Sequence, residues 1–227
     1  MRVVAGQWRG RPLATPSGRA TRPTSDKVRE AMFDVLAALP DADAARRHHS
    51  DPGQLAGHVV LDLFAGSGGL GIEALSRGAA RCTFVERDRA ALRALHANLE
   101  RLGMGVAAAD RRSRTLPQDE EPRVRVLGAD ARRALPADAL RGSRYTLLFA
   151  DPPYEQYLEL QPSLVGLLVP LLAQGAVLVI ETAARTPIDL PWRVVREKRY
   201  GDTKVTFLVA DGLQDAEGEA DDDGEAI

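Results

Sequence analysis

The residues with the clearest chemical potential are Asp151, Pro152, Pro153 and Tyr154, which directly follow the apolar run Tyr145–Ala150. Two consecutive prolines lack backbone N–H donors and restrict φ, so this segment is stiff and its carbonyl groups can accept hydrogen bonds. A carboxylate beside those carbonyls suits the exocyclic –NH₂ group of a base, and the tyrosine ring offers a face for stacking. A rigid turn would explain the prolines alone. We therefore expect these four residues to be catalytic and to hold a base amine.

A glycine-rich turn after the apolar run 59–63 is the second stretch suited to ligand binding. Its glycines allow a sharp turn and a close approach of the backbone to a ligand, since no Cβ is in the way. The first N–H groups of the next helix point at the same place. The glycine spacing fits a dinucleotide-binding turn and by itself leaves the kind of cofactor open. The predicted cofactor-binding residues of this stretch are Asp62, Phe64, Ala65, Gly66, Ser67, Gly68 and Gly71.

Acidic residues follow the ends of successive predicted strands, which is where ligands bind in a parallel sheet. Glu86 ends the second strand, so its carboxylate can accept hydrogen bonds from both hydroxyls of a ribose. Asp130 follows the third strand and could accept from an adenine amino group or cap the next helix. Asp62 could orient the glycine turn, meet a cationic amino acid group or only cap backbone N–H groups. The predicted cofactor site also includes Arg87, Ala131 and Asp151.

Strands that alternate with helices must position these residues. This order predicts an α/β fold with a doubly wound, Rossmann-like sheet of seven strands, mostly parallel, that ends in an antiparallel hairpin. Strands are expected at 59–63, 81–86, 123–127, 145–150, 176–181, 192–200 and 204–210. Helices are expected at about 25–39, 69–77, 89–102 and 156–172, with a short helix after Asp130.

Charge is distributed unevenly along the 227 residues. Eight acidic residues and no Lys or Arg lie in 211–227, whereas the first thirty residues carry seven Lys and Arg against Asp26 and Glu30. A basic N-terminal segment indicates a polyanionic partner, and a solvated charged face is equally consistent with it. We expect a basic arm or hairpin at 1–23, a main domain at 24–210 and a disordered acidic tail at 211–227.

Further features exclude several classes of protein. No apolar run is long enough to span a membrane, and the first ten residues lack the apolar core of a signal peptide. The single cysteine, Cys82, lies in an apolar stretch, which indicates a reduced core residue in a cytoplasmic protein. His48 and His49 have no second pair of ligands, so we expect no metal site. The polar stretches 41–53 and 104–122 indicate surface insertions.

The glycine turn together with Asp-Pro-Pro-Tyr resembles S-adenosylmethionine-dependent amino methyltransferases. The N-terminal stretches RVVAGQWRGRPL at 2–13 and RPTSDKVREAMF at 22–33, with YGDT at 200–203, resemble the RsmD family more specifically. That family methylates the N2 amine of one guanine in 16S ribosomal RNA. The resemblance covers about 2–210, and neither the insertions nor the tail interrupts a motif.

This resemblance implies roles for individual residues. The 66–71 turn, Glu86 and Asp130 would bind S-adenosylmethionine, and 151–154 would bind the guanine. Arg22, Thr24 and Ser25 would close over the methionine end of the cofactor. The substrate would be 16S ribosomal RNA within an assembling small subunit, bound by a monomer, and Trp8 would stack on RNA or fasten the hairpin. The residues expected to contact RNA are Arg2, Trp8, Arg9, Arg11, Arg19 and Arg22.

The expected reaction is an in-line displacement in which the amine attacks the sulfonium methyl group. Acceptors at Asp151 and the Pro152 carbonyl would favour pyramidal geometry at nitrogen and stabilise the growing positive charge. The same segment would also serve a DNA adenine N6-methyltransferase, against which only the N-terminal stretches argue. A ribosome-assembly module without catalysis is a further alternative, which the intact Asp151 and glycine turn disfavour. No hydride-transfer site accompanies the glycines, so a nicotinamide enzyme is disfavoured.

Overall fold

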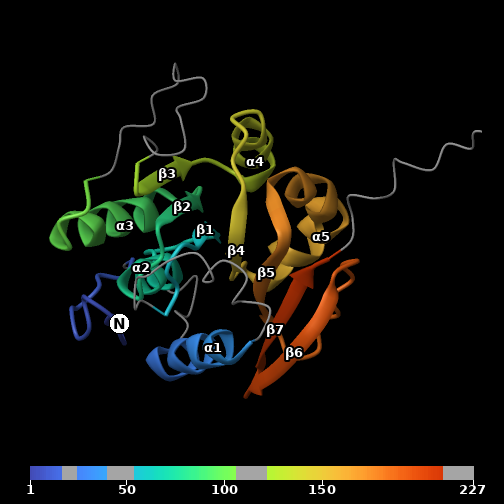
Figure 1. The fold of residues 1–227 in the computed structure, drawn as a ribbon, viewed down its shortest axis with the longest axis horizontal. Coiled ribbons are helices and arrows are strands. Elements are labelled where there is room, and N and C mark those ends of the chain that lie inside the picture. Colours follow the sequence, from blue (N-terminus) through green and yellow to red (C-terminus); the bar gives the residue numbers. More distant parts are fainter. Residues whose placement is uncertain (17–24, 40–53, 106–121, 212–227) are drawn as a thin grey trace, which may run out of the picture.

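The computed structural model describes residues 1–16, 25–39, 54–105 and 122–211. Within these residues, Figure 1 shows a twisted sheet with helices on both faces. The strand order is β3-β2-β1-β4-β5-β7-β6; β1 to β5 are parallel, and β7 is antiparallel to β5 and β6. The predicted seven-stranded mixed sheet is therefore confirmed. The strands are β1 (Val59–Leu63), β2 (Arg81–Glu86), β3 (Val124–Gly128), β4 (Tyr145–Ala150), β5 (Leu172–Ala183), β6 (Arg193–Tyr200) and β7 (Thr203–Ala210).

Two hydrophobic layers lie on opposite faces of the sheet, because side chains alternate along each buried strand. One layer joins the sheet to α1, α2 and α3, and the other joins it to α4 and α5. Figure 1 shows that α4 and α5 lie away from α1. The helices are α1 (Asp26–Ala38), α2 (Gly69–Ser76), α3 (Arg89–Arg101), α4 (Ala131–Ala139) and α5 (Tyr154–Leu168), followed by the 3-10 helix η4 (Val169–Leu171).

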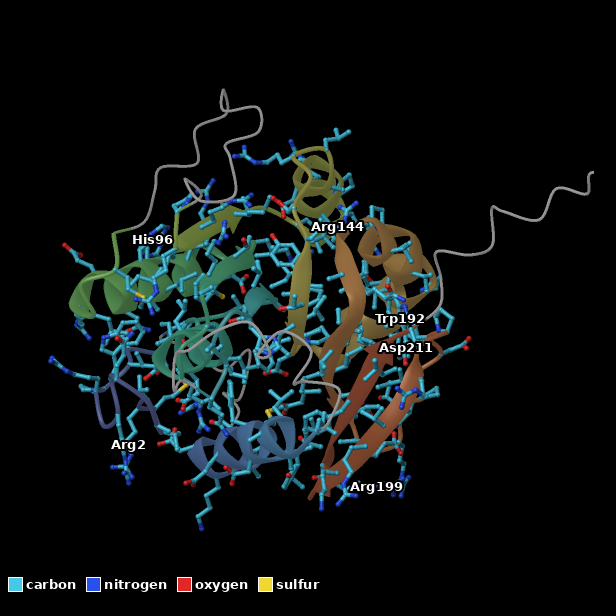
Figure 2. All side chains as sticks on the ribbon, in the orientation of Figure 1. Arg2, His96, Arg144, Trp192, Arg199 and Asp211 are labelled. Carbon is cyan, nitrogen blue, oxygen red and sulfur yellow. The ribbon has the colours of Figure 1, made fainter. Side chains whose placement is uncertain are left out.

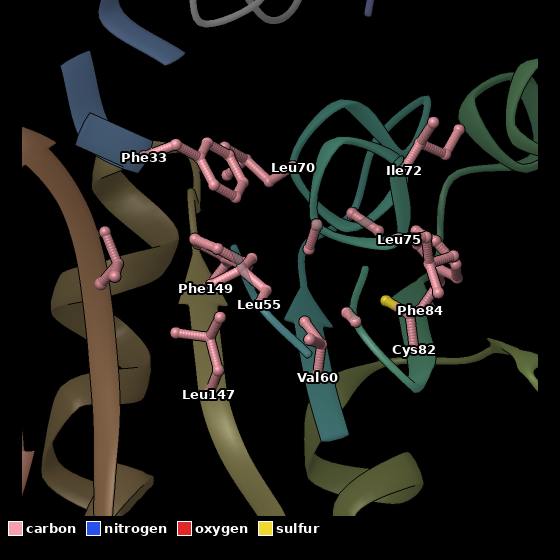
Figure 3. Close-up of a cluster of buried hydrophobic side chains, with 14 of the residues drawn as sticks. Phe33, Leu55, Val60, Leu70, Ile72, Leu75, Cys82, Phe84, Leu147 and Phe149 are labelled. Atoms are coloured by element: carbon pink, nitrogen blue, oxygen red, sulfur yellow. The ribbon is translucent and has the colours of Figure 1, made fainter. Parts of the chain in front are cut away.

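The first layer fixes α1 against the centre of the sheet. Phe33 of α1 packs on Phe149 of β4, with ring centroids 5.3 Å apart (Figure 3). Cys82 lies in the same cluster and is buried, as predicted. Burial raises the pKa of its thiol well above the ordinary value, so the side chain behaves as an apolar core residue.

The segment after β4 differs from the prediction. A helix was expected at 156–172, but α5 begins at Tyr154, with Pro153 as its N-cap, and ends at Leu168. The two prolines therefore lead straight into the helix, which continues through Pro162, and the 3-10 helix η4 that follows has Pro170 in its first turn. β5 extends to Ala183, two residues beyond the predicted end, because β7 pairs with it through Ala183 and Thr203.

The N-terminal segment forms a narrow loop instead of an extended arm. Arg2 and Pro12 form an antiparallel bridge, and the N–H groups of Val3 and Gly10 donate to Arg11 and Val3 at 3.0 and 2.9 Å. The predicted insertion at 41–53, most of the one at 104–122 and nearly all of the acidic tail lie outside the described residues. Among the described helices, none combines the length and apolarity required to cross a membrane.

Candidate functional site

The candidate site lies where the strand order reverses between β1 and β4. Leu63 at the end of β1 pairs with Val85 on one side and with Ala150 on the other. Glu86 pairs with Gly128 at the ends of β2 and β3. The glycine turn and the residues after β4 therefore meet at one edge of the sheet, as predicted, and such edges bind ligands in α/β sheets.

Backbone conformation at the glycine turn explains its residues. Gly66 and Gly68 have φ values of +57° and +86°, which favour glycine, whereas Phe64 adopts a φ of +63° that is uncommon for a residue with a side chain. A Cβ at Gly71 would lie 2.4 Å from Cε1 of Phe84, so α2 can pack on β2 only with glycine here. A Cβ at Gly66 would meet no atom within 4 Å. The described structure is therefore open above Gly66, where a ligand can approach the backbone.

Asp62 connects β1 to the helix that follows the turn. Its Oδ2 atom accepts a hydrogen bond from the N–H of Gly71 at 2.8 Å, within the protein interior. Burial raises the pKa of this carboxyl to about 7, the Gly71 bond opposes the rise, and the charges of Asp151 and Glu86 add to it. Of the roles predicted for Asp62, capping the backbone of α2 is the one that the structure shows.

Glu86 is fixed by three backbone N–H groups. Its Oε2 accepts from Gly66 at 2.8 Å, and its Oε1 accepts from Arg87 and Asp88 at 2.7 Å each. A carboxylate offers about four acceptor positions, so about one remains for a ribose hydroxyl. The carboxylate is thus held rigidly beside the open face of the turn, and the contact with a ribose remains a prediction.

Asp130 caps α4, which is one of its two predicted roles. Its Oδ1 accepts from the N–H of Arg132 at 3.0 Å, and Oδ2 pairs with Arg87 at 2.8 Å. The Arg132 N–H and the Arg87 side chain lower the pKa of this carboxyl. Ala131 begins the helix and is buried. The adenine contact of Asp130 remains a prediction.

The proline segment follows β4 at the same edge. Pro152 is buried, and Pro153 caps α5, where its carbonyl accepts from the N–H of Tyr157 at 3.1 Å. Asp151 is close enough to Asp62 for its charge to raise the pKa of that buried carboxyl. Tyr154 is the first residue of α5, and its side chain lies outside the described part of the structure.

The basic N-terminal loop is bonded to α2, a contact that spans about 70 residues of sequence. Both carboxylate oxygens of Glu73 accept from this loop, Oε2 from Val4 at 2.7 Å and Oε1 from Ala5 at 2.9 Å. Glu73 also pairs with Arg77 at 2.8 Å and lies 3.7 Å from Nε of Arg29, and all three side chains are buried. The loop is therefore part of the main packing unit.

The predicted RNA-contacting residues of this loop lie at different places. Arg2, Arg9 and Arg11 are exposed, and Figure 2 shows Arg2 at the periphery below the loop. Trp8 lies where α2 ends, and the Arg123 guanidinium stacks on its ring at 5.6 Å from the centroid. Trp8 is thus held against Arg123 and α2, and its stacking on RNA remains a prediction.

The segment expected to close over the cofactor is described at its end only. Ser25 caps α1 and accepts from the N–H of Val28 at 3.3 Å. Its predicted contact with the cofactor remains a prediction. The predicted residues Arg19, Arg22 and Thr24 lie outside the described residues.

Asn98 is a site residue that sequence reasoning missed. Its amide exchanges hydrogen bonds with the backbone of Ala14 at 2.7 and 2.9 Å and donates to the Ser67 carbonyl in the glycine turn at 3.0 Å. It thereby joins the N-terminal segment to the cofactor turn. The available signal was an asparagine beside Leu95 and Leu99 on the apolar stripe of a helix, where polar residues need a partner.

The fold is that of the Rossmann-like methyltransferases. The structure of an RNA methyltransferase from Salinibacter ruber in complex with S-adenosyl-L-homocysteine shares the fold, with a TM-score of 0.52 and 18% identity over 90% of this chain and 100% of that one. The chain belongs to the family described as conserved hypothetical protein 95, whose model matches residues 1–209. This family assignment confirms the resemblance to the RsmD family.

Two relatives from Escherichia coli match nearly the whole chain. Ribosomal RNA small subunit methyltransferase D is 33% identical over an alignment of 229 positions, which covers 98% of this chain and 94% of that protein. The solved structure of yhhF has a TM-score of 0.67 and 31% identity, and covers 93% of this chain and 98% of its own.

Proposed function

We propose that this protein transfers a methyl group from S-adenosylmethionine to the N2 amine of a guanine in small-subunit ribosomal RNA. The observation that carries the proposal is the position of Asp151 and the two prolines beside the glycine turn, at the switch point of the sheet. The match to ribosomal RNA small subunit methyltransferase D over 98% of this chain supports RNA as the substrate.

The residues present suit the cofactor. Gly66 leaves its side of the turn open, and Glu86 is fixed with about one acceptor position left for a ribose hydroxyl. Asp62 supplies a buried carboxyl at the first turn of α2, and its charged form would favour a cationic group. S-adenosylmethionine has no phosphate, so the turn would provide close backbone approach and not an anion site. When bound, the cofactor supplies an electrophilic methyl group on a sulfonium.

The chain's own residues would orient the nucleophile. The amine of guanine is a poor nucleophile because its lone pair is delocalised into the ring. Acceptors at Asp151 and the Pro152 carbonyl would hold its N–H groups, direct the lone pair at the methyl carbon and stabilise positive charge at nitrogen. A new N–C bond forms as the C–S bond breaks, sulfur keeps the electron pair, and the nitrogen releases one proton.

The target guanine must leave its stack to reach this edge, which favours a loop or bulge of RNA over an intact duplex. The exposed Arg2, Arg9 and Arg11 would bind phosphates nearby. We propose an assembling small subunit as the substrate, a monomer as the active form and a reaction without a metal ion.

The test is methyl transfer from labelled S-adenosylmethionine to unmodified 16S RNA and to unmodified small subunits, with the product nucleoside identified by mass spectrometry. The expected product is N2-methylguanosine. An N6-methyladenine product, or no product with either substrate, would overturn the proposal.

A further inference from the structure

The carboxyl end of β5 carries two buried polar residues after an apolar run. Ala176–Ile180 is apolar, and then Glu181 and Thr182 follow with 8% and 0% of their surfaces exposed. Oγ1 of Thr182 has no hydrogen-bond partner among the described residues. The strand continues through both residues, paired with β7. Carboxylates are rarely buried in a central strand, so Glu181 at the end of β5 is a candidate functional residue.

Glu181 is the neighbour of Asp151 across the parallel pair β4–β5. Ala150 pairs with Ile180, so the next residue on each strand lies beside the other, and neighbouring strands are about 4.8 Å apart. Phe149 and Val179 belong to the hydrophobic layer that faces α1. Because side chains alternate, Asp151 and Glu181 project to this same face two residues further on.

Asp62 lies on the same face, two residues closer to the start of the strands than Asp151 and Glu181. It pairs with Phe149, and Val60, two residues before it, lies in the same hydrophobic layer. The effect of the Asp151 charge on the pKa of Asp62 shows that these two carboxyl groups share one electrostatic environment. Glu181 lies on the side of Asp151 that faces away from the glycine turn, because β5 lies beyond β4 from β1.

The chemistry of the adjacent Asp151 and Glu181 carboxylates matches one base edge. The Watson–Crick edge of guanine presents two neighbouring donors, the N1–H group and the N2 amine. Adenine presents a donor at N6 beside an acceptor at N1, which a carboxylate would repel. Two adjacent carboxylates therefore complement guanine and disfavour adenine.

We propose that Glu181 determines specificity by accepting the N1–H of the target guanine while Asp151 holds the N2 amine. This inference rests on the proposed function and names the part of the site that selects the base. Sites that bond a substrate N–H discriminate strongly against an analogue without it, because the buried acceptor is then left unpaired.

The test compares guanine with 2-aminopurine at the target position of the same RNA. 2-Aminopurine keeps the amine at C2 but has an acceptor in place of N1–H. The wild-type protein should prefer guanine in kcat/KM by about 100-fold, and Glu181→Gln should reduce that preference by about tenfold or more. The amide introduced by Glu181→Gln can donate a hydrogen bond to N1 of 2-aminopurine, so the variant should use this base better relative to guanine. A merely structural role of Glu181 would not predict this change in preference.

Two variants and one wild-type measurement complete the design. Thr182→Val and Glu100→Gln, a surface change on α3, should both keep the wild-type preference. An equal loss of preference in Thr182→Val would show a packing effect and overturn the inference. If the wild-type protein prefers guanine over 2-aminopurine by less than about threefold, this result alone overturns the inference. Formation of N2-methylguanine with an unchanged preference in Glu181→Gln refutes the inference alone, whereas an N6-methyladenine product refutes it together with the proposed function.

Discussion

The buried carboxylate of Asp62 at the end of β1 holds the N–H of Gly71 in the first turn of α2, at 2.8 Å. This bond fixes the helix start relative to the strand, so the glycine turn between them has a defined shape. The same carboxylate has a pKa near 7 because of its burial and its acidic neighbours. Stability and site geometry therefore depend on one titrating group.

Asp62→Asn should flatten part of the pH dependence of stability. Between about pH 4 and 7 the unfolded state ionises Asp62 while the folded state keeps its proton, so the wild-type free energy of unfolding falls by about 1.4 kcal/mol per pH unit from this group. Below pH 4 the group has no effect, and above pH 7 the loss is constant. Urea unfolding of both proteins without cofactor should show the difference in slope; parallel curves would contradict the pKa assignment.

Gly71→Ala should destabilise the fold by about 3 kcal/mol through overpacking. The new methyl group would lie 2.4 Å from Phe84 Cε1, 2.7 Å from Cys82 Sγ and 2.9 Å from Asp62 Oδ2. Gly166→Ala in α5 is the matched control, because a Cβ there meets nothing within 4 Å. That change should stabilise the protein by about 0.5 kcal/mol. Thermal unfolding distinguishes them, and equal midpoints would refute the packing argument.

Glu73→Gln should cost about 3 kcal/mol, since it leaves buried Arg77 without its carboxylate at 2.8 Å and removes one of the two carboxylates beside buried Arg29, which keeps Asp26 at 2.8 Å. Glu197→Gln removes an ion pair with Lys204 at 3.2 Å in which Glu197 is half exposed. This control should change the free energy of unfolding by less than about 1 kcal/mol. Denaturant titration is the measurement, and a small effect at Glu73 would mean that the N-terminal loop is held by other contacts.

Asp151→Ala should reduce methyl transfer by about 100-fold or more while cofactor affinity stays within about threefold. The predicted reason is that Asp151 bonds the amine more strongly as charge develops on it. Single-turnover kinetics and calorimetric titration of the cofactor separate the two quantities. Asp211→Ala is the control and should keep activity, because Asp211 follows Ala210, at the end of β7 opposite to the one that pairs with Ala183. Near-normal turnover in Asp151→Ala would remove this residue from the catalytic role.

The sequence predicted the parts of the fold that depend on local pattern. The bounds of β1, β2 and β4 follow from uninterrupted apolar runs, and Ser25 and Asp130 cap their helices as short-range chemistry requires. The edge that gathers the glycine turn, Glu86 and Asp151 followed from the strand order alone.

Contacts between distant segments could not be predicted in this way. In the sequence, Glu73 is an isolated charge in an apolar helix, and only the fold places the N–H groups of residues 4 and 5 against it. The amide of Asn98 bonds to residues that are 84 and 31 positions away in the sequence. The sequence predicts that the strand ends at Glu181, because no nearby residue indicates that pairing with β7 extends β5 to Ala183.

The bonded N-terminal loop also bears on how the chain could be divided. Residues 1–14 are held by backbone bonds to Glu73, Ser76 and Asn98, so the covalent link to α1 is not what keeps them in place. The boundary at residue 23 therefore separates two stretches of sequence but no independent folding units. Separate peptides divided there should reassemble by fragment complementation, as the strands of one core do.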